Sequence, residues 1–179
     1  MKVVIDTSSL LSLVRYYLPF DRNKVLFDFI KAKIEGKEII VLDVVFNECS
    51  YTSKGIVVAT LDYIKLKKNQ EKTSDLLPTR KFFNQLENNF INAAVRNKLS
   101  DVEFENRKNA FLDSADAKLL LFSQANFSEK IVIVSEETEA NNDNKSFKKL
   151  PAICKILNLE IITLPQLLER YDEIKVEFK

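Results

Sequence analysis

Short apolar runs rich in β-branched residues alternate with segments of helical periodicity, and this alternation constrains the fold more than any other feature of the chain. Strands that alternate with helices form a parallel sheet. Only two Gly and four Pro occur, too few for a turn-rich all-β protein. We therefore predict an α/β fold with a central parallel sheet covered by helices on both sides and with its first strand in the interior. The expected strands are Val3–Ile5, Glu38–Leu42, Ile131–Val134 and Ile161–Thr163.

Capping and stop residues predict where the intervening helices begin and end. A hydroxyl among Thr7–Ser9 can cap the first helix, and Ser114 precedes a strongly apolar helix. The stretch from about 51 to 109 is long, polar and helical in pattern, so we expect a single domain over 1–179 that contains a helical insertion. The other expected helices are Leu10–Tyr17, Lys24–Glu35, one capped by Asp43 that carries Glu48, Thr79–Leu99, Ala152–Leu157, and a last one after Pro165.

The composition excludes several kinds of site. Histidine is absent, which rules out a His general base, a Ser-His-Asp triad and imidazole-based zinc sites. Cys49 and Cys154 form no C-x-x-C pair, so we expect reduced, buried thiols in a cytoplasmic protein. We expect neither a signal peptide nor a membrane span. The formal net charge of +1 is not the footprint of a typical nucleic-acid binder, so such affinity would need a local basic patch.

Isolated acids stand at the edges of the apolar segments. Asp6 directly follows the first strand, Glu48 lies in the helix after the second, Asp116 begins a helix, and Glu137 follows the third strand. Because open α/β sheets bind ligands outside the carboxyl ends of their strands, we expect these four carboxylates to converge. Each pair about 4 Å apart would cost roughly 4 kcal/mol at an effective dielectric near 20, and a hard divalent cation removes that cost. Asp113 would share a face with Asp116 only if their helix began that early.

Each acid also has an ordinary structural interpretation. Asp6 could cap a helix, although the hydroxyls of Thr7–Ser9 make a further cap redundant. Glu48 could be a solvated helix residue and Glu137 a solvated loop residue. Asp116 could simply complement a helix dipole. The chemical interpretation therefore depends on the four acids acting together, and it predicts a metal-dependent hydrolase.

In order and setting, these acids resemble the four-part acidic signature of PIN domains. The matching segments are Val4-Ile-Asp6-Thr-Ser8, Glu48 after the second strand, Ala115-Asp116-Ala117 and Val134-Ser135-Glu136-Glu137. That family has a Rossmann-like, three-layer fold, and its members are mostly Mg- or Mn-dependent ribonucleases, including toxins of toxin–antitoxin pairs. The resemblance covers almost the whole chain, and the two ends match better than the middle. It implies a three-layer PIN fold with Mg²⁺ or Mn²⁺ as cofactor.

The resemblance also assigns roles to individual residues. The implied metal ligands and catalytic residues are Asp6, Glu48, Asp116 and Glu137. Ser8 would support Asp6 by a hydrogen bond, and Ser135 takes the family's Thr or Ser position. Glu137 is longer than the usual Asp or Asn, so it would reach a metal through water. The segment after Glu137 resembles a little-studied subgroup, which weakens transfer of the toxin role more than transfer of the nuclease chemistry.

The predicted activity is therefore cleavage of single-stranded or looped RNA. Phosphates would bind the cluster of Lys145, Lys148 and Lys149, or a second set in the middle of the chain. That second set comprises Lys65, Lys67, Lys68, Lys72, Arg80 and Lys81. An antitoxin is a partner if the chain is a toxin, and apolar surface on the N-terminal helices would suit a homodimer.

Two other interpretations stay open. A PIN-like domain that has lost catalysis could bind RNA or protein, which the near-neutral charge and the substitution at Glu137 favour. A small-molecule phosphohydrolase could use Asp6 as its nucleophile, but residue 8 is Ser where an Asp-x-Asp motif needs Asp. Manganese titration would separate the first alternative from a nuclease.

Overall fold

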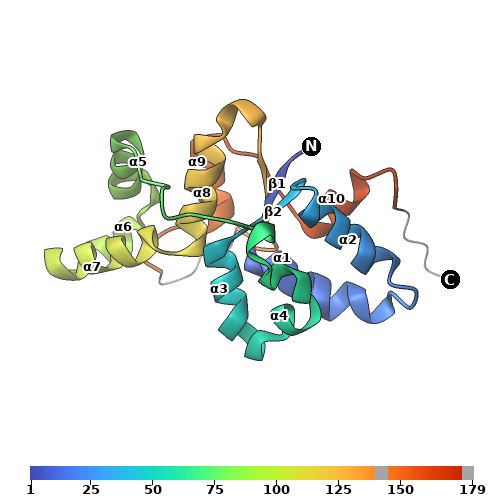
Figure 1. Cartoon of the computed structure of the whole chain (residues 1–179). Coiled ribbons are helices and arrows are strands. Elements are labelled where there is room, and N and C mark those ends of the chain that lie inside the picture. The colour runs from blue at the N-terminus through green and yellow to red at the C-terminus, as the bar shows by residue number, and fades with distance from the viewer. Residues whose placement is uncertain (140–144, 175–179) are drawn as a thin grey trace.

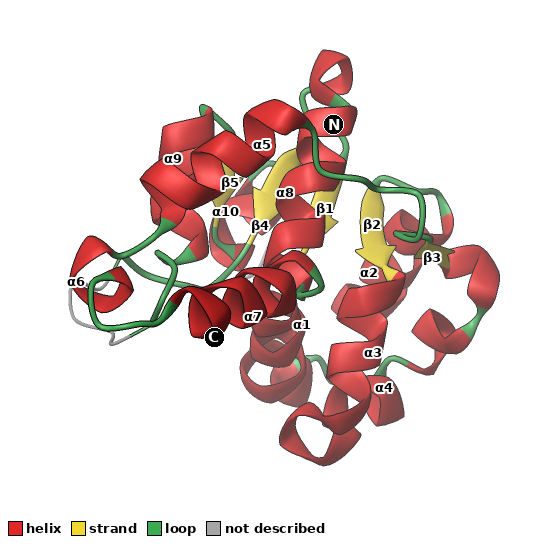
Figure 2. Cartoon of the chain, turned by 90° about the vertical axis from the view of Figure 1, so that its left-hand side faces the viewer, coloured by secondary structure: helices red, strands yellow, loops and turns green. Residues whose placement is uncertain are grey.

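A computed structural model describes residues 1–139 and 145–174. Its five strands are all parallel and lie in the order β3-β2-β1-β4-β5, as Figure 2 shows. The strands are β1 (Val3–Ile5), β2 (Ile39–Leu42), β3 (Gln70–Glu71), β4 (Val132–Val134) and β5 (Ile161–Ile162). The predicted α/β fold is confirmed, and β1 lies in the interior of the sheet between β2 and β4.

Helices cover both faces of the sheet and produce three layers. Figures 1 and 2 place α8 (Ala115–Ala125) and α9 (Leu150–Leu157) on one face, and α2 (Val25–Glu35) and α10 (Leu164–Glu169) on the other. Strands β1, β2 and β4 are buried at every position, which explains their continuous apolar sequences. The other α-helices are α1 (Thr7–Ser12), α3 (Asp43–Tyr51), α4 (Ile56–Thr60), α5 (Arg80–Gln85), α6 (Ala93–Arg96) and α7 (Asp101–Leu112).

Short turns of 3₁₀- and π-helix connect these elements. The 3₁₀ turns are Leu18–Phe20, Thr52–Gly55, Asp62–Lys65, Lys67–Asn69 and Phe127–Glu129, and the π turns are Leu13–Tyr17 and Leu86–Phe90. Within 1–139 and 145–174, no helix combines the length and the apolar character needed to cross a membrane.

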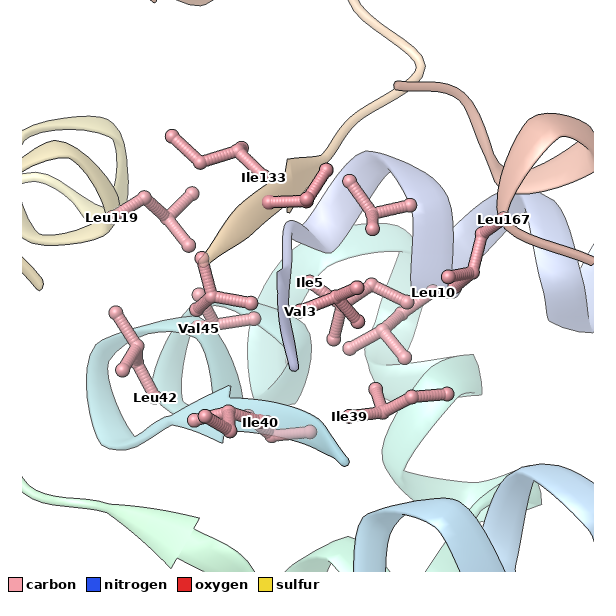
Figure 3. Close-up of a cluster of buried hydrophobic side chains, with 14 of the residues drawn as sticks. Val3, Ile5, Leu10, Ile39, Ile40, Leu42, Val45, Leu119, Ile133 and Leu167 are labelled. Atoms are coloured by element: carbon pink, nitrogen blue, oxygen red, sulfur yellow. The ribbon is translucent and has the colours of Figure 1, made fainter. Parts of the chain in front are cut away.

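Apolar side chains from both layers hold β1 in place. Figure 3 shows Val3 and Ile5 between Leu119 on one side and Leu10 and Leu167 on the other. All five are fully buried. Full burial of such a side chain contributes roughly 1.5–3 kcal/mol, so the position of β1 is strongly determined. The residues that follow β1 therefore start from a fixed point at the carboxyl end of the sheet.

The first helix begins earlier than predicted, and its N-cap is Asp6. The Asp6 carboxylate accepts a hydrogen bond from the Thr7 N–H at 2.7 Å, and its backbone carbonyl accepts one from the Leu10 N–H at 3.1 Å. The hydroxyls of Thr7–Ser9 consequently lie inside the helix and do not cap it. The argument that these hydroxyls make Asp6 redundant as a cap is wrong, since Asp6 itself performs that role.

The predicted helix Thr79–Leu99 is interrupted, because residues 90–92 pair with a distant segment. Ile91 and Phe147 form an isolated antiparallel bridge. The N–H of Lys148 donates to the Phe90 carbonyl at 2.8 Å, and the N–H of Asn92 donates to the Ser146 carbonyl at 2.8 Å. This tertiary pairing takes the chain out of helical geometry between the π turn and α6.

Two further features of the chain after β2 differ from expectation. Asp43 is the first residue of α3 and does not cap it; its carboxylate accepts a hydrogen bond from the Thr73 hydroxyl at 2.6 Å. The stretch from 51 to 109 is not wholly helical, because it supplies the edge strand β3. Both differences come from contacts between the middle of the chain and β2.

Candidate functional site

The register of β1 and β4 places Asp6 beside Ser135. Ile5 pairs with Val134, so the next residue of each strand emerges at the same carboxyl edge. Asp6 is 5% exposed, and its Oδ2 accepts hydrogen bonds from the hydroxyls of Ser8 at 2.6 Å and Ser135 at 2.9 Å. The predicted hydrogen bond from Ser8 to Asp6 is therefore present. These donors, with the Thr7 N–H, fix the orientation of the buried carboxylate.

Glu48 is oriented toward the same edge by a residue of the first helix. The Thr7 hydroxyl donates to Glu48 Oε2 at 2.8 Å, joining the first turn of α1 to the middle of α3. The neighbouring Cys49 is buried, and burial raises the pKa of its thiol to about 12. Cys49 thus stays protonated, which makes it unsuited to bind metal or to act as a nucleophile.

Asp116 completes a cluster of acids drawn from four elements. Ser114 caps α8 by accepting from the Ala117 N–H at 3.3 Å, as predicted, and Asp116 lies in the first turn. Burial raises the pKa of the Asp116 carboxyl to about 7, with further contributions from the negative charges of Asp6, Glu137 and Glu48. The other three predicted acids are therefore close enough to Asp116 to act on its charge. Lys145 opposes this shift as a nearby positive charge.

The two glutamates after β4 contact different helix N-termini. Glu137 Oε2 accepts from the Leu150 N–H at the start of α9 at 3.1 Å, and Glu136 Oε1 accepts from the Leu164 N–H at the start of α10 at 2.6 Å. Each carboxylate complements the positive end of a helix dipole. Glu137 thus has a structural role in addition to its place among the acids that act on Asp116.

The arrangement is not a closed set of metal ligands. In residues 1–139 and 145–174, no three His, Cys, Asp or Glu side chains are grouped closely enough to hold a metal ion together. A carboxylate offers about four lone-pair sites, and the bonds described above use one each on Glu48 and Glu137 and three on Asp6. Mg²⁺ commonly binds through one or two carboxylates and keeps several waters. The donor set therefore fits a hydrated oxygen-seeking ion better than a fully protein-ligated one.

In the described part of the chain, hydroxyl and backbone groups rather than ion pairs contact these acids. Among the residues that the structure describes, no Lys or Arg forms an ion pair with Asp6, Glu48, Asp116 or Glu137. The charge of the cluster is instead spread over hydroxyl and backbone donors, which carry no full positive charge. A divalent cation from solution would therefore meet a favourable potential here.

A pocket of about 100 Å³ opens beside the acids. Its wall joins Asp116 and Glu137 to the three lysines predicted to bind RNA and to two aromatic rings. The lining residues are Phe111, Asp116, Glu137, Lys145, Phe147, Lys148 and Lys149. The Lys148 ammonium donates to the Asn89 carbonyl at 2.7 Å, which holds it at the rim. The pocket is thus lined by side chains of both charges.

The other predicted site residues do not belong to this pocket. Asp113 is exposed at the C-terminal end of α7, and it is absent from the charges that shift Asp116. Helix α8 begins at Ala115, so Asp113 and Asp116 do not share a helical face. The second basic set is exposed and does not line the pocket; it comprises Lys65, Lys67, Lys68, Lys72, Arg80 and Lys81.

Three contacts of the site escaped the sequence analysis. Thr7 was expected as a cap, and its bond to Glu48 depends on how α1 packs against α3. Phe111 and Phe147 carry no local signal, because 36 positions separate them and only the tertiary fold brings them together. The contacts of Glu136 and Glu137 with two different helices could have been predicted, since successive residues of an extended chain point to opposite sides.

Comparison with known proteins gives a family and no activity. A family model described as "Domain of unknown function (DUF4411)" matches residues 3–174, nearly the whole chain. Neither the curated proteins nor the solved structures contain a match to this sequence.

Proposed function

Because the chain belongs to the DUF4411 family, whose description assigns no activity, we propose a function from its site: a metal-dependent endoribonuclease that uses Mg²⁺ or Mn²⁺ to hydrolyse RNA phosphodiester bonds. One observation carries this proposal. Asp6, Glu48 and Glu137 all act on the charge of Asp116 at the carboxyl end of the sheet, and no described Lys or Arg forms an ion pair with any of the four acids. The proposed metal-binding and catalytic residues are Asp6, Glu48, Asp116 and Glu137.

The side chains around the acids have separate tasks in this proposal. Ser8 and Ser135 hold the Asp6 carboxylate in one orientation, and Thr7 does the same for Glu48. A bound Mg²⁺ or Mn²⁺ supplies a water of lowered pKa and a counter-charge for the phosphate. Lys145 offers a positive charge across the pocket from Asp116, where a phosphate oxygen can bind.

The choice of RNA as substrate rests on the resemblance to PIN domains. The α/β architecture with a central parallel sheet is compatible with that resemblance, and so is the clustering of the acids in its signature. The chain contains no His, and hydrolysis by hard metal ions requires none.

Cleavage of a mixed-sequence RNA with and without EDTA tests this function. We expect cleavage in Mg²⁺ or Mn²⁺, its loss in EDTA, and a fall on the order of 100-fold or more in Asp6→Asn. Asn keeps the size and one acceptor oxygen of the cap, so the melting temperature should change little. Asp43→Asn is the matched control, because Asp43 follows the neighbouring strand but its carboxylate binds Thr73. Equal cleavage by wild type and Asp6→Asn, in preparations cleared of contaminating ribonuclease, would exclude this mechanism.

A second candidate function is a non-catalytic RNA- or protein-binding module. The observation in its favour is that no three acids of the described residues are grouped as metal ligands, while Glu137 binds the N-terminus of α9. Such a module would bind RNA without binding Mn²⁺ tightly. Isothermal titration with Mn²⁺ alone therefore distinguishes it from the nuclease.

The proposal extends to protein partners. An exposed apolar surface on the N-terminal helices includes Tyr16 at 66%, Phe20 at 77% and Tyr51 at 74% exposure. Arg15 donates to the Ser53 hydroxyl at 2.7 Å, which joins the segment of Tyr16 to that of Tyr51. A homodimer or an antitoxin would cover this surface. Sedimentation of the purified chain tests the homodimer, and a small gene overlapping the coding sequence would support an antitoxin.

A further inference from the structure

Two aromatic rings form one wall of the pocket beside the acids. Phe111 lies at the end of α7, and Phe147 follows the buried Ser146. Their ring centroids are 4.7 Å apart and the ring planes meet at 33°, so the rings are stacked with a tilt. Both rings are partly buried, and both line the pocket together with Asp116. Aromatic surface thus lines the same pocket as the carboxylates of Asp116 and Glu137.

Hydrogen bonds on both sides of Phe147 hold this surface in place. The Asn92 N–H donates to the Ser146 carbonyl and the Lys148 N–H donates to the Phe90 carbonyl, each at 2.8 Å. Arg107 of α7 donates to the Ser146 hydroxyl at 2.7 Å, which ties the segment of Phe147 to the helix of Phe111. The two rings therefore stand on a fixed backbone and need little ordering when a ligand arrives.

The chemistry of the pocket selects among ligands. A free phosphate would use the positive charges and leave the rings uncovered, whereas an apolar side chain of a protein would cover the rings and make no use of the positive charges. A nucleotide uses both, since its base stacks on an aromatic ring and its phosphate binds ammonium groups.

We infer that the pocket formed by Phe111, Phe147 and the adjacent lysines receives the unpaired base of a nucleotide whose phosphate lies at the acid cluster. This inference rests on the proposed function and specifies its substrate class. A base can enter only after it has left its duplex partner and its neighbours in the stack. The site therefore selects single-stranded RNA by its shape, and stacking adds to the contact that phosphates make with Lys145 and Lys148.

Binding of an abasic oligonucleotide tests the inference without requiring catalysis. The probe is a fluorescent single-stranded oligoribonucleotide, compared in EDTA with an abasic ribose-phosphate chain of equal length and charge. We expect wild type to bind the base-containing strand roughly tenfold more tightly. A duplex of the same sequence should bind about as weakly as the abasic strand. Equal affinity of wild type for the abasic and base-containing strands, or binding of neither, would overturn the inference.

Matched variants assign the preference to the pocket. Phe111→Leu and Phe147→Leu keep apolar volume but remove the flat ring, so each should lose most of the preference for bases. Phe127→Leu is the control, because Phe127 is 62% exposed and precedes β4 at the other end of the sheet. A full preference in both pocket variants would contradict the assignment. If a pocket variant does not fold, the comparison of abasic and base-containing strands with wild type still decides.

The two proposals fail in different ways. Metal-dependent cleavage without any preference for bases would support the nuclease and contradict the base pocket. Preference for bases without cleavage would support the pocket and indicate the non-catalytic module.

Discussion

The acids at the two ends of the sheet differ in their ion-pair partners. At the amino end, Glu129 pairs with Lys2 at 2.6 Å and Glu160 pairs with Arg170 at 2.6 Å. At the carboxyl end, the acids around Asp116 have hydroxyl and backbone donors but, within the described parts of the chain, no ion-pair partner. Within the described residues, the fold thus pairs acids with cations at one end of the sheet and leaves the acids at the other end without an ion-pair partner.

The difference supports the proposal that the carboxyl end of the sheet binds a charged ligand. Exposed ion pairs such as those at the amino end contribute about 0–1 kcal/mol each and have no further chemical consequence. Burial, together with the negative charges of the other three acids, instead raises the pKa of Asp116 to about 7, so that folding makes the ionised form of this carboxyl costly. A chain that only needed stability would be better served by pairing or removing these acids. We propose that a cation that binds after folding accounts for their arrangement.

The largest difference between the two ends should appear in RNA cleavage. We expect Asp116→Asn to lower the cleavage rate on the order of 100-fold or more, because it removes one of the charges that attract the cation. Glu160→Gln at the amino end should leave the rate unchanged. Gel analysis of labelled RNA in Mn²⁺ measures both. Loss of activity in both variants would mean that the substitutions act through stability. Loss in neither variant would mean that the two ends of the sheet do not differ in their importance for cleavage.

The next difference concerns stabilisation by metal. Millimolar Mn²⁺ should raise the melting temperature of wild type by roughly 5 °C, because a ligand that binds only the folded chain stabilises it. The double variant Asp6→Asn/Asp116→Asn should show no such shift. Glu129→Gln/Glu160→Gln should respond as wild type does. An equal shift in all three proteins, by differential scanning fluorimetry, would place Mn²⁺ elsewhere.

Asp116 should also make the metal-free protein less stable as pH rises. Its folded pKa of about 7 lies above the ordinary value of 3.8, so the folded chain holds this proton more tightly than the unfolded chain. The resulting stabilisation is complete below about pH 4 and is lost as pH rises through about 7. In EDTA, the melting temperature of Asp116→Asn relative to wild type should therefore rise between about pH 5 and about pH 8. A difference between the two proteins that is independent of pH would contradict the shift.

The smallest effect should come from the paired acids. Lys2→Gln breaks the ion pair with Glu129, in which both side chains are about half exposed. We expect a loss of at most about 1 kcal/mol in the free energy of unfolding. Urea denaturation at low and high salt measures it, and the loss should shrink as salt rises. A loss of several kcal/mol would show that ion pairs at the amino end of the sheet contribute far more to the free energy of unfolding than exposed pairs usually do.

The sequence predicts the fold well where one local pattern decides. The buried strands β1, β2 and β4 stand out because every position faces the core and is therefore apolar. Strand β3 was missed because Gln70–Glu71 has no apolar pattern and pairs with β2 only through its backbone. The break at Ile91 was missed because its cause, the bridge to Phe147, lies far along the chain.

For the site, the sequence predicts the proximity of the acids better than their contacts. The settings of the acids and the resemblance to PIN domains together selected Asp6, Glu48, Asp116 and Glu137, and the fold brings the other three within electrostatic reach of Asp116. It did not predict that Asp6 caps its own helix or that Glu137 binds the start of α9, because those hydrogen bonds depend on backbone geometry. An acid that accepts a structural hydrogen bond can still bind a cation, since a carboxylate has several lone pairs.

Anomalous diffraction from a crystal grown with Mn²⁺ tests the central claim most directly, because it locates the metal without reference to activity. We predict one strong anomalous peak at the carboxyl end of the sheet, about 2.1 Å from a carboxylate oxygen of Asp6 or Asp116 and linked to the other acids through water. The absence of a peak among these acids at millimolar Mn²⁺, or a peak only beside the ion pairs at the amino end, would contradict the account.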